Sequence, residues 1–237
     1  MNPQTDINLT QELKAALLSR SASLAGFADL RELPEDVRDG FPYGIVIGMA
    51  WDKDVLRGIA DGPTHAYHRN YDDLNERLDM LSLFTEGWLE ERGYRSLAKT
   101  RRIVGVYDKT KLTTKLPHKT VATRAGIGWI GKCALLVTPE FGSALRISSI
   151  LTNAPLETGT PLNESRCGEC TVCGEICPAK AVSGSKWSAG LSREKFWDAQ
   201  ACEETARARS REKLGEDITL CGLCILRCPW TQKYVEG

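Results

Sequence analysis

Eight of the nine cysteines are gathered in the C-terminal part of the chain, and their spacing is the strongest chemical signal in the sequence. The first four, followed by a proline, form a C-x2-C-x2-C-x3-C-P run: Cys167, Cys170, Cys173, Cys177 and Pro178. In such a run three thiolates at equal spacing bind one iron-sulfur cubane, and the fourth reaches a second cluster. The run therefore predicts two neighbouring [4Fe-4S] clusters.

A second, incomplete run follows, in which Ile218 stands where the first cysteine of a repeat would be. This run consists of Cys221, Cys224 and Cys228 with Pro229, and Cys202 is available upstream as the missing ligand. Eight thiolates then suffice for two cubanes. We expect one cluster to be bound by Cys167, Cys170, Cys173 and Cys228, and the other by Cys177, Cys202, Cys221 and Cys224.

Two other uses of the cysteines are disfavoured. Paired zinc sites also use C-x2-C knuckles, but they need neither a third cysteine at the same spacing nor the C-x3-C-P ending. A disulfide framework belongs to exported proteins, and the polar start of this chain, Met1 to Leu9, lacks the layout of a signal peptide. Two adjacent clusters indicate that electrons enter through one and leave through the other.

The composition is that of a soluble folded protein. The 237 residues include 31 basic and 31 acidic side chains, with 42% hydrophobic and 26% charged residues, which excludes wholesale disorder. The longest apolar run, Tyr43 to Trp51, is far shorter than the ~20 residues that span a bilayer. We therefore expect no membrane contact and a cytoplasmic location.

Residues 1–158 have the pattern of a layered α/β domain, because helical and strand-like segments alternate. Helices are predicted over Asn8–Leu24, with Asn8 as N-cap, and over Thr64–Arg92, ended by Gly93. Strands are predicted over Gly44–Ala50, Arg102–Tyr107, Ala134–Thr138 and Ala144–Leu151. A Gly, Pro and Thr-rich linker, Thr158–Glu164, leads into residues 159–237, which we predict to be a ferredoxin-like module stabilised by its two clusters.

Three closely spaced glycines occur in the segment Ala122–Lys132 (ATRAGIGWIGK). Glycine lets a backbone approach a large ligand or adopt a positive φ. Two explanations account for the three glycines: a turn that binds a ligand, and a tight turn between a helix and a strand. The residue after the segment, Cys133, is expected to be a small buried side chain whose thiol has a minor chance of facing a cofactor.

With these segments in place, the chain resembles the epoxyqueuosine reductases. The similarity rests on GIGWIGK, LLVTPEFGSALRISSIL, CGECTVCGEICP and CGLCILRCPW, and it extends from about Tyr43 to Trp230. Those enzymes combine a double [4Fe-4S] module with a cobalamin held in the preceding α/β domain, and they reduce an epoxide in a tRNA nucleoside. The same cofactor pairing makes the chain similar to the reductive dehalogenases.

The resemblance implies that the turn Gly128–Lys132 lies against a corrinoid, with the nearer cluster delivering electrons to cobalt. The corrinoid contacts expected on this basis are Lys119, Arg124, Gly126, Gly128, Trp129, Ile130, Gly131 and Lys132. Arg95–Arg124 also carries nine basic residues against one acid, an excess suited either to a phosphate-bearing ligand or to a solvated surface.

The chain departs from the family in two places. The family's catalytic acid lies in a V-D-[ST]-A-P-V segment, but the corresponding position here is Leu112 or Thr114, depending on the alignment. The sequence also ends at Gly237, soon after Trp230, whereas the tRNA-modifying enzymes continue into a helical-repeat domain. The resemblance is thus to a short form, with tRNA a weaker expectation than the cofactors.

A different proton donor is needed if the chain catalyses a reduction. His118 is the first candidate, because histidine has an unperturbed pKa of ~6.5, and Tyr107 and Asp108 are the reserves. We expect a corrinoid-dependent reductase that takes electrons from an external ferredoxin or flavodoxin and acts on a small molecule or a nucleoside. The alternatives are an electron-transfer protein that serves a partner enzyme and a nucleic-acid enzyme with a structural cluster.

Overall fold

The computed structural model describes residues 6–100, 108 and 110–237. The chain divides into two compact units that exchange segments along the sequence. The first unit comprises Met1–Met49, Leu74–Ile127 and Arg146–Leu162, and the second comprises Ala50–Asp73, Gly128–Leu145 and Asn163–Gly237. The chain passes from the first unit to the second for the last time after Leu162, near the boundary predicted after residue 158. The sequence carries no linker-like signal at the earlier points where the chain passes between the units.

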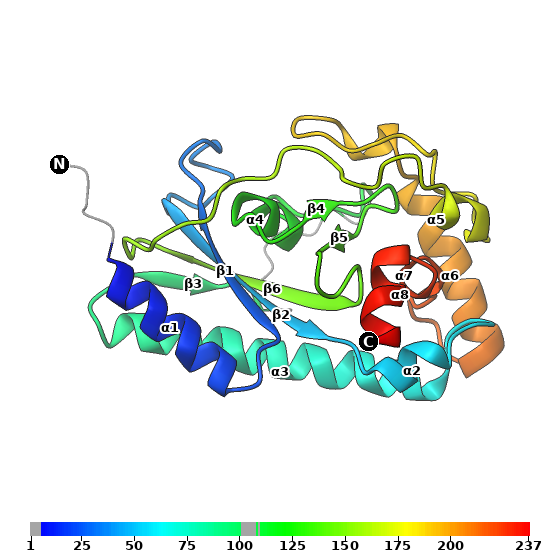
Figure 1. Cartoon of the computed structure of the whole chain (residues 1–237), viewed down its shortest axis with the longest axis horizontal. Helices are drawn as coiled ribbons and strands as arrows, with labels where there is room; N and C mark the ends of the chain where they lie inside the picture. The colour runs from blue at the N-terminus through cyan, green and yellow to red at the C-terminus, as the bar shows by residue number, and fades with distance from the viewer. Residues whose placement is uncertain (1–5, 101–107, 109) are drawn as a thin grey trace. The chain divides into compact units, whose positions relative to one another are not determined.

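A four-stranded sheet forms the centre of the first unit, in the order β1-β2-β6-β3 (Figure 1). The strands are β1 (Leu24–Asp29), β2 (Tyr43–Ala50), β3 (Ser96–Ala98) and β6 (Leu145–Thr152). β1 pairs antiparallel with β2, and β3 pairs antiparallel with β6. β2 is buried along all but its last residue, as expected for an apolar strand covered on both faces.

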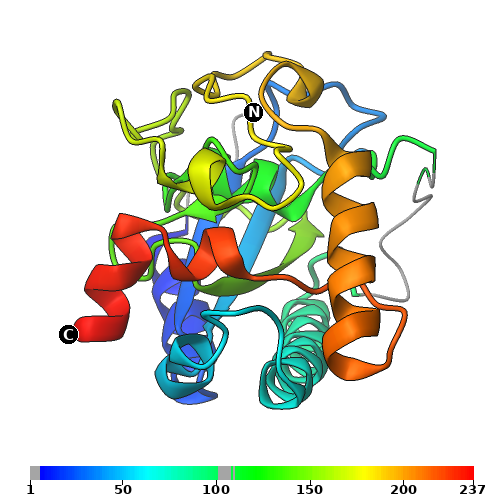
Figure 2. The ribbon, with the colours of Figure 1, turned by 90° about the vertical axis from the view of Figure 1, so that its right-hand side faces the viewer.

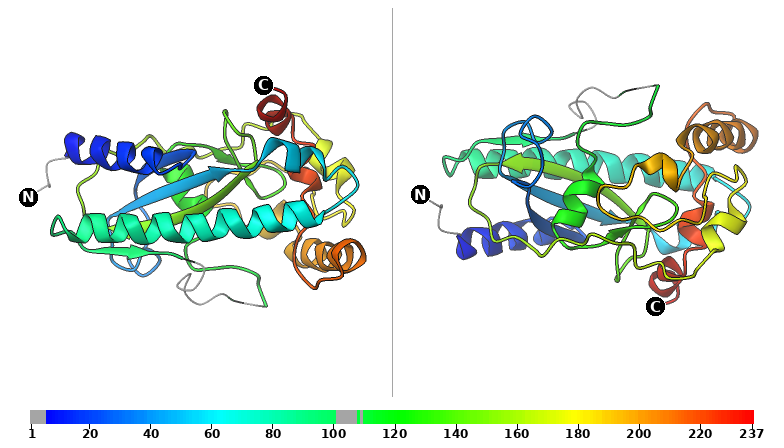
Figure 3. Two further views of the ribbon diagram at one scale, coloured as in Figure 1. Left: turned by 90° about the horizontal axis from the view of Figure 1, so that it is seen from below. Right: turned by 90° about the horizontal axis from the view of Figure 1, so that it is seen from above.

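Helices cover both faces of this sheet (Figure 3). On one face lie α1 (Ile7–Ser19) and the part of α3 (His65–Glu90) that belongs to the first unit, where Ser82 Oγ is 2.9 Å from Ser148 Oγ of β6. On the other face lies α4 (His118–Arg124), so close that a Cβ at Gly44 would meet Val121 at 2.8 Å. The layered α/β architecture is confirmed.

Several predicted element boundaries were wrong for identifiable reasons. Asp6, not Asn8, caps α1, because its carboxylate accepts a hydrogen bond from Leu9 N at 2.9 Å. α1 ends at Ser19 and the chain turns at Ser21, which has a φ of 68°, so that Leu24 begins a strand instead of ending a helix. The strand predicted over Arg102–Tyr107 lies outside the described residues.

The second unit contains one hairpin and several short helices. The strands β4 (Trp129–Ile130) and β5 (Leu136–Val137) pair antiparallel, which shortens the strand predicted over Ala134–Thr138 because Ala134 turns with a φ of 60°. The helices are α2 (Lys53–Arg57), the first turns of α3, α5 (Val172–Ile176), a 3-10 turn at Arg193–Lys195, α6 (Ala199–Leu214), α7 (Leu223–Leu226) and α8 (Pro229–Glu236).

α6 is the longest helix after residue 163 (Figure 2) and was not predicted. It buries few side chains, so it has no apolar stripe for a periodicity analysis to detect. Both of its ends are marked locally, since the Asp198 carboxylate accepts from Ala201 N at 3.0 Å and Gly215 ends the helix with a φ of 72°.

The apolar core of the second unit surrounds part of the cysteine module. Two cysteines and two tryptophans pack against this core, which brings aromatic rings next to the sulfur atoms. Its buried members are Trp129, Ile130, Ala134, Val137, Trp187 and Phe196. Among the residues that the structure describes, no helix has the length and apolar character needed to cross a bilayer.

Candidate iron-sulfur centre

The first cysteine run folds as a tight loop that leads into a short helix. Cys170 N donates to Cys167 O at 3.2 Å, and Gly168 between them has a φ of 55°. Cys173 lies in α5, and Cys177 follows the last residue of that helix. Spacing of two residues thus places three thiols around one turn of the chain, and the extra residue before Cys177 carries the fourth thiol past the helix end.

The second run uses a glycine and a proline to place its thiols. Gly222, with a φ of 80°, starts α7, in which Cys224 lies. A Cβ at Gly222 would meet Ile59 at 2.5 Å and the Tyr67 hydroxyl at 2.8 Å, so no larger residue fits without displacing them. Cys228 then separates α7 from α8, whose first residue is a proline.

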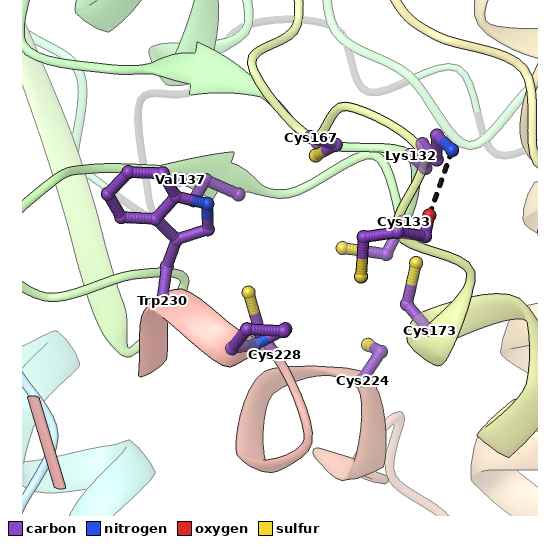
Figure 4. A pocket seen from close by; sticks show the side chains of 11 residues that line it. Lys132, Cys133, Val137, Cys167, Cys173, Cys224, Cys228 and Trp230 are labelled. Atoms are coloured by element: carbon purple, nitrogen blue, oxygen red, sulfur yellow. Dashed lines mark hydrogen bonds between the residues drawn. The ribbon is translucent and has the colours of Figure 1, made fainter. Parts of the chain in front are cut away.

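The two runs meet at an open pocket, whose empty volume is about 480 Å³ when the open solvent at its mouth is included (Figure 4). Six cysteines line this pocket: Cys133, Cys167, Cys170, Cys173, Cys224 and Cys228. The other lining residues are Gly131, Lys132, Val137, Pro229 and Trp230. All four members of the first predicted ligand set are therefore brought together. None of the nine cysteines is in a disulfide, and no three His, Cys, Asp or Glu side chains of the described residues are placed to hold a single metal ion.

Three members of the second predicted set are also neighbours. Burial, with the nearby charges of Cys177 and Cys221, raises the pKa of the Cys202 thiol to about 11. Cys224, the fourth member, lines the pocket of the first set.

Burial also raises the pKa of Cys228, and Cys133 and burial raise that of Cys173. A bound metal favours the thiolate form of such thiols, because its positive charge stabilises the negative sulfur. The thiols release their protons when the metal binds.

The glycine-rich turn is fixed by close packing inside each unit. A Cβ at Gly126 would meet Thr160 O at 2.3 Å, one at Gly128 would meet Val137 O at 2.3 Å, and one at Gly131 would meet Val137 Cγ2 at 2.8 Å. These distances account for all three glycines without a ligand. Contact of the turn with a corrinoid stays a prediction.

The other predicted corrinoid contacts are mostly engaged within the protein. Trp129 is fully buried, and its ring meets that of Trp230 edge to face at 5.1 Å. Arg124, buried in the first unit, pairs with Glu32 and donates to Leu162 O at 3.1 Å. Ile130 is also buried, whereas Lys119 is partly exposed.

Lys132 is only 5% exposed and donates from Nζ to Cys170 O at 2.8 Å. It therefore anchors the loop of the first cysteine run to the turn.

The candidate proton donors lie in the first unit. His118 begins α4, and its Nδ1 is 2.8 Å from Ser149 Oγ. Burial, followed by the charges of Arg146 and Lys99, lowers the pKa of His118 to about 4, so its imidazole is neutral at neutral pH.

Asp108 makes a turn in which its carboxylate accepts from the backbone N–H groups of Thr110 and Lys111 at 2.9 and 3.0 Å. The Thr110 hydroxyl and these N–H groups hold the pKa of Asp108 below its usual range, which keeps it ionised. Tyr107 lies outside the described residues. The roles of all three residues stay predictions.

Comparison with known proteins supports the presence of two iron-sulfur clusters. Residues 166–231 match the family described as 4Fe-4S double cluster binding domain. An epoxyqueuosine reductase of Staphylococcus aureus is 27% identical over 236 residues, which cover 95% of this chain and 52% of the relative. The matched region spans between 30% and 53% of the full length of the curated relatives compared.

Two solved structures share the fold. A reductive dehalogenase, described with a mechanism for B12-dependent dehalogenation, matches 98% of this chain and 34% of its own chain, with a TM-score of 0.74 and 14% identity. An epoxyqueuosine reductase, solved with a modified tRNA stem loop, matches 95% of this chain and 66% of its own chain, with a TM-score of 0.61 and 23% identity. The expected resemblance is thus confirmed: this chain is similar in sequence to the epoxyqueuosine reductases, and its residues 166–231 match a 4Fe-4S double cluster binding domain.

Proposed function

We propose that this chain is an oxidoreductase that passes electrons through two [4Fe-4S] clusters to a corrinoid and then to a substrate. The observation that carries the proposal is the meeting of Cys167, Cys170, Cys173 and Cys228 at one pocket that Gly131 and Lys132 also line. Cysteine thiols and residues of the predicted corrinoid turn therefore line the same pocket in the second unit.

The residues present fit two clusters. One set of four thiols lines the pocket, and Cys177 and Cys221 each lie near enough to Cys202 to raise its pKa, with Cys224 as their proposed fourth ligand. Bound clusters supply one-electron transfer at low potential. The chain itself supplies apolar cover from Val137 and Trp230, which limits contact between water and the sulfur atoms.

The proposed corrinoid site includes the exposed part of the glycine-rich turn. Among the predicted contacts of the first unit, Gly126 and Lys119 are partly exposed. The buried residues Trp129 and Lys132 fix the shape of the turn. Support comes from the sequence relatives and from the fold shared with a B12-dependent dehalogenase. A bound corrinoid supplies a strongly reducing cobalt centre.

For the proton, we propose His118, with Tyr107 and Asp108 as reserves. Because burial, followed by the charges of Arg146 and Lys99, lowers the pKa of His118, this residue needs a nearby negative charge to gain a proton at neutral pH. An anionic substrate provides that charge. A nucleoside within tRNA and a small anionic molecule both meet this requirement, and one relative was solved with a tRNA stem loop. We propose an external ferredoxin or flavodoxin as the electron donor.

Anaerobic reconstitution with cobalamin tests this function. The proposal predicts a complex with one corrinoid per chain, in which reduction of the clusters is followed by reduction of cobalt, seen in the absorption spectrum. The Cys167→Ala variant should still bind the corrinoid but reduce it more slowly. A wild-type protein that carries both clusters but binds no corrinoid contradicts the proposal.

The second candidate is an electron-transfer protein that serves a partner enzyme or a partner's corrinoid. It is favoured by the acid position of the family, which holds Leu112 or Thr114, and by the turn geometry that keeps Asp108 ionised. This candidate predicts clusters that exchange electrons with flavodoxin while the chain alone binds neither cobalamin nor an epoxyqueuosine-modified stem loop.

A further inference from the structure

The first residue of α4, His118, is hydrogen-bonded to the central sheet of the first unit. Its Nδ1 lies 2.8 Å from the hydroxyl oxygen of Ser149 in β6. Among the residues that the structure describes, Ser149 is the only hydrogen-bond partner of this imidazole. His118 is partly exposed, whereas Ser149 is only 1% exposed. The pair therefore joins a buried hydroxyl to a ring that remains partly accessible.

The burial of Ser149 decides which atom of the pair carries the shared hydrogen. In the described part of the chain, the Ser149 hydroxyl has no second acceptor. If Nδ1 were the donor, the hydroxyl hydrogen would be buried without an acceptor, and this state would be disfavoured about tenfold or more. If the hydroxyl donates to an unprotonated Nδ1, both atoms are satisfied. The neutral imidazole then carries its hydrogen on Nε2.

The neighbouring serine of β6 has partners of its own. Successive side chains of a strand point to opposite faces, so Ser148 points away from the face that carries Ser149. The Ser148 hydroxyl lies 2.9 Å from Ser82 Oγ of α3 and donates to Lys99 O at 3.4 Å. Ser148 is also buried, so it provides a matched control for the removal of a hydroxyl from this strand.

The second ring nitrogen of His118, Nε2, is the atom that can meet a ligand. None of the described residues bonds to Nε2, and this atom is not among their buried polar atoms that lack a partner. Arg146 and Lys99 place positive charge near the ring, with Asp79 as the opposing acid, and Lys99 in turn pairs with Asp39. An N–H group beside two cations favours an acceptor oxygen that carries negative charge.

We propose that Ser149 is a positioning residue that holds His118 in the tautomer with its hydrogen on Nε2, so that this N–H is presented to an oxygen atom of an anionic ligand. The proposal rests on the function proposed above, in which His118 meets an anionic substrate. The neutral imidazole first binds that substrate by donating a hydrogen bond. Because a hydrogen on Nδ1 would leave the Ser149 hydroxyl without an acceptor, Ser149 also favours the neutral ring before a ligand binds.

The test measures the ring-nitrogen resonances of His118 in the anaerobically purified full chain labelled with nitrogen-15 histidine, with His118→Gln identifying the signals. At neutral pH the wild type should show a protonated Nε2 and an unprotonated Nδ1, with the other tautomer at about a tenth or less. In Ser149→Ala the two tautomers should become comparable. The pKa of His118 should rise in this variant, because a hydrogen bond to the neutral form is lost.

Two further variants separate positioning from a merely structural role. Ser149→Thr keeps the hydroxyl and should retain the wild-type tautomer, and Ser148→Ala should leave it unchanged. Inorganic phosphate serves as the anionic probe, and its titration should shift the Nε2 signal of the wild type at lower concentration than that of Ser149→Ala.

Three outcomes overturn the proposal. They are a hydrogen on Nδ1 in the wild type, the same tautomer in Ser149→Ala as in the wild type, and an Nε2 signal that phosphate does not shift. Failure of the chain to bind a corrinoid is a separate result. If the tautomer depends on Ser149 as expected, that failure refutes the proposed function and not the effect of Ser149 on His118.

Discussion

The buried ammonium of Lys132 donates to the backbone oxygen of Cys170 at 2.8 Å and thereby joins the β4–β5 hairpin to the first cysteine loop. Lys132 is only 5% exposed, and the hydrogen bond that it makes is partly buried. The contact gives the lysine of the GWIGK turn a role inside the cluster module, whatever else the turn binds.

Replacement of Lys132 by methionine should destabilise the protein and weaken cluster retention. Removal of the charged donor from this partly buried hydrogen bond costs about 1–3 kcal/mol. Chemical unfolding followed by circular dichroism measures this loss. The control is Lys186→Met, because Lys186 pairs with Glu169 at an exposed site and should change stability by less than about 1 kcal/mol. Equal stability of the two variants would contradict the anchoring role.

Paired substitutions test the division of the thiols into two sets. Cys173→Ala and Cys228→Ala should each remove about four irons, and the double variant should remove no more than either one, because both belong to the proposed first set. Cys228→Ala combined with Cys202→Ala should leave almost none. Iron analysis of the four variants checks this, and additive loss within the first pair refutes the assignment.

His118 should remain neutral well below the pH at which an exposed histidine is protonated. Its pKa falls from 6.5 to about 4 on folding, so the unfolded chain binds more protons between these values. The contribution of His118 to the free energy of unfolding is therefore retained at pH values above 6.5. As the pH falls to 4, this contribution decreases by up to about 3 kcal/mol.

Imidazole resonances measured against pH test this expectation, with His118→Gln identifying the signal. The same variant should lose the His118 part of the stability decrease in this pH range. A midpoint near 6.5 for His118 would show that its surroundings do not disfavour the charged form.

Two glycine substitutions should have opposite effects. Gly128→Ala places a methyl group 2.3 Å from Val137 O, so the β4–β5 hairpin must shift and the cluster site with it. Gly87→Ala, in α3, meets nothing within 4 Å and should stabilise the helix by about 0.5–1 kcal/mol. Thermal unfolding and iron content of both variants check this, and tolerance of Gly128→Ala would mean that the hairpin is less constrained than its packing indicates.

The cysteine module was the most predictable part of the site. Spacing alone brought Cys167, Cys170, Cys173 and Cys228 into one predicted set, because thiolate geometry around a cubane constrains the sequence directly. The apolar strand β2 and helix α3 were predictable for the same reason, since burial leaves a regular pattern.

Other features left no such pattern. Cys133 lines the same pocket as Cys173 and Cys224, and these residues are far apart in the chain, so no spacing rule reveals their proximity. α6 is mostly exposed, and its caps were the only local signal. The lowered pKa of His118 arises from burial and from Arg146 and Lys99, which only the folded chain brings near.

The central claim is that eight thiols bind two iron-sulfur cubanes. Metal and sulfide analysis of anaerobically purified protein, combined with Mössbauer spectroscopy, tests it most directly. The account predicts about eight irons and about eight sulfides per chain, with spectra of [4Fe-4S] clusters only. Stoichiometric zinc without sulfide, or thiols oxidised to disulfides in the native protein, would contradict it.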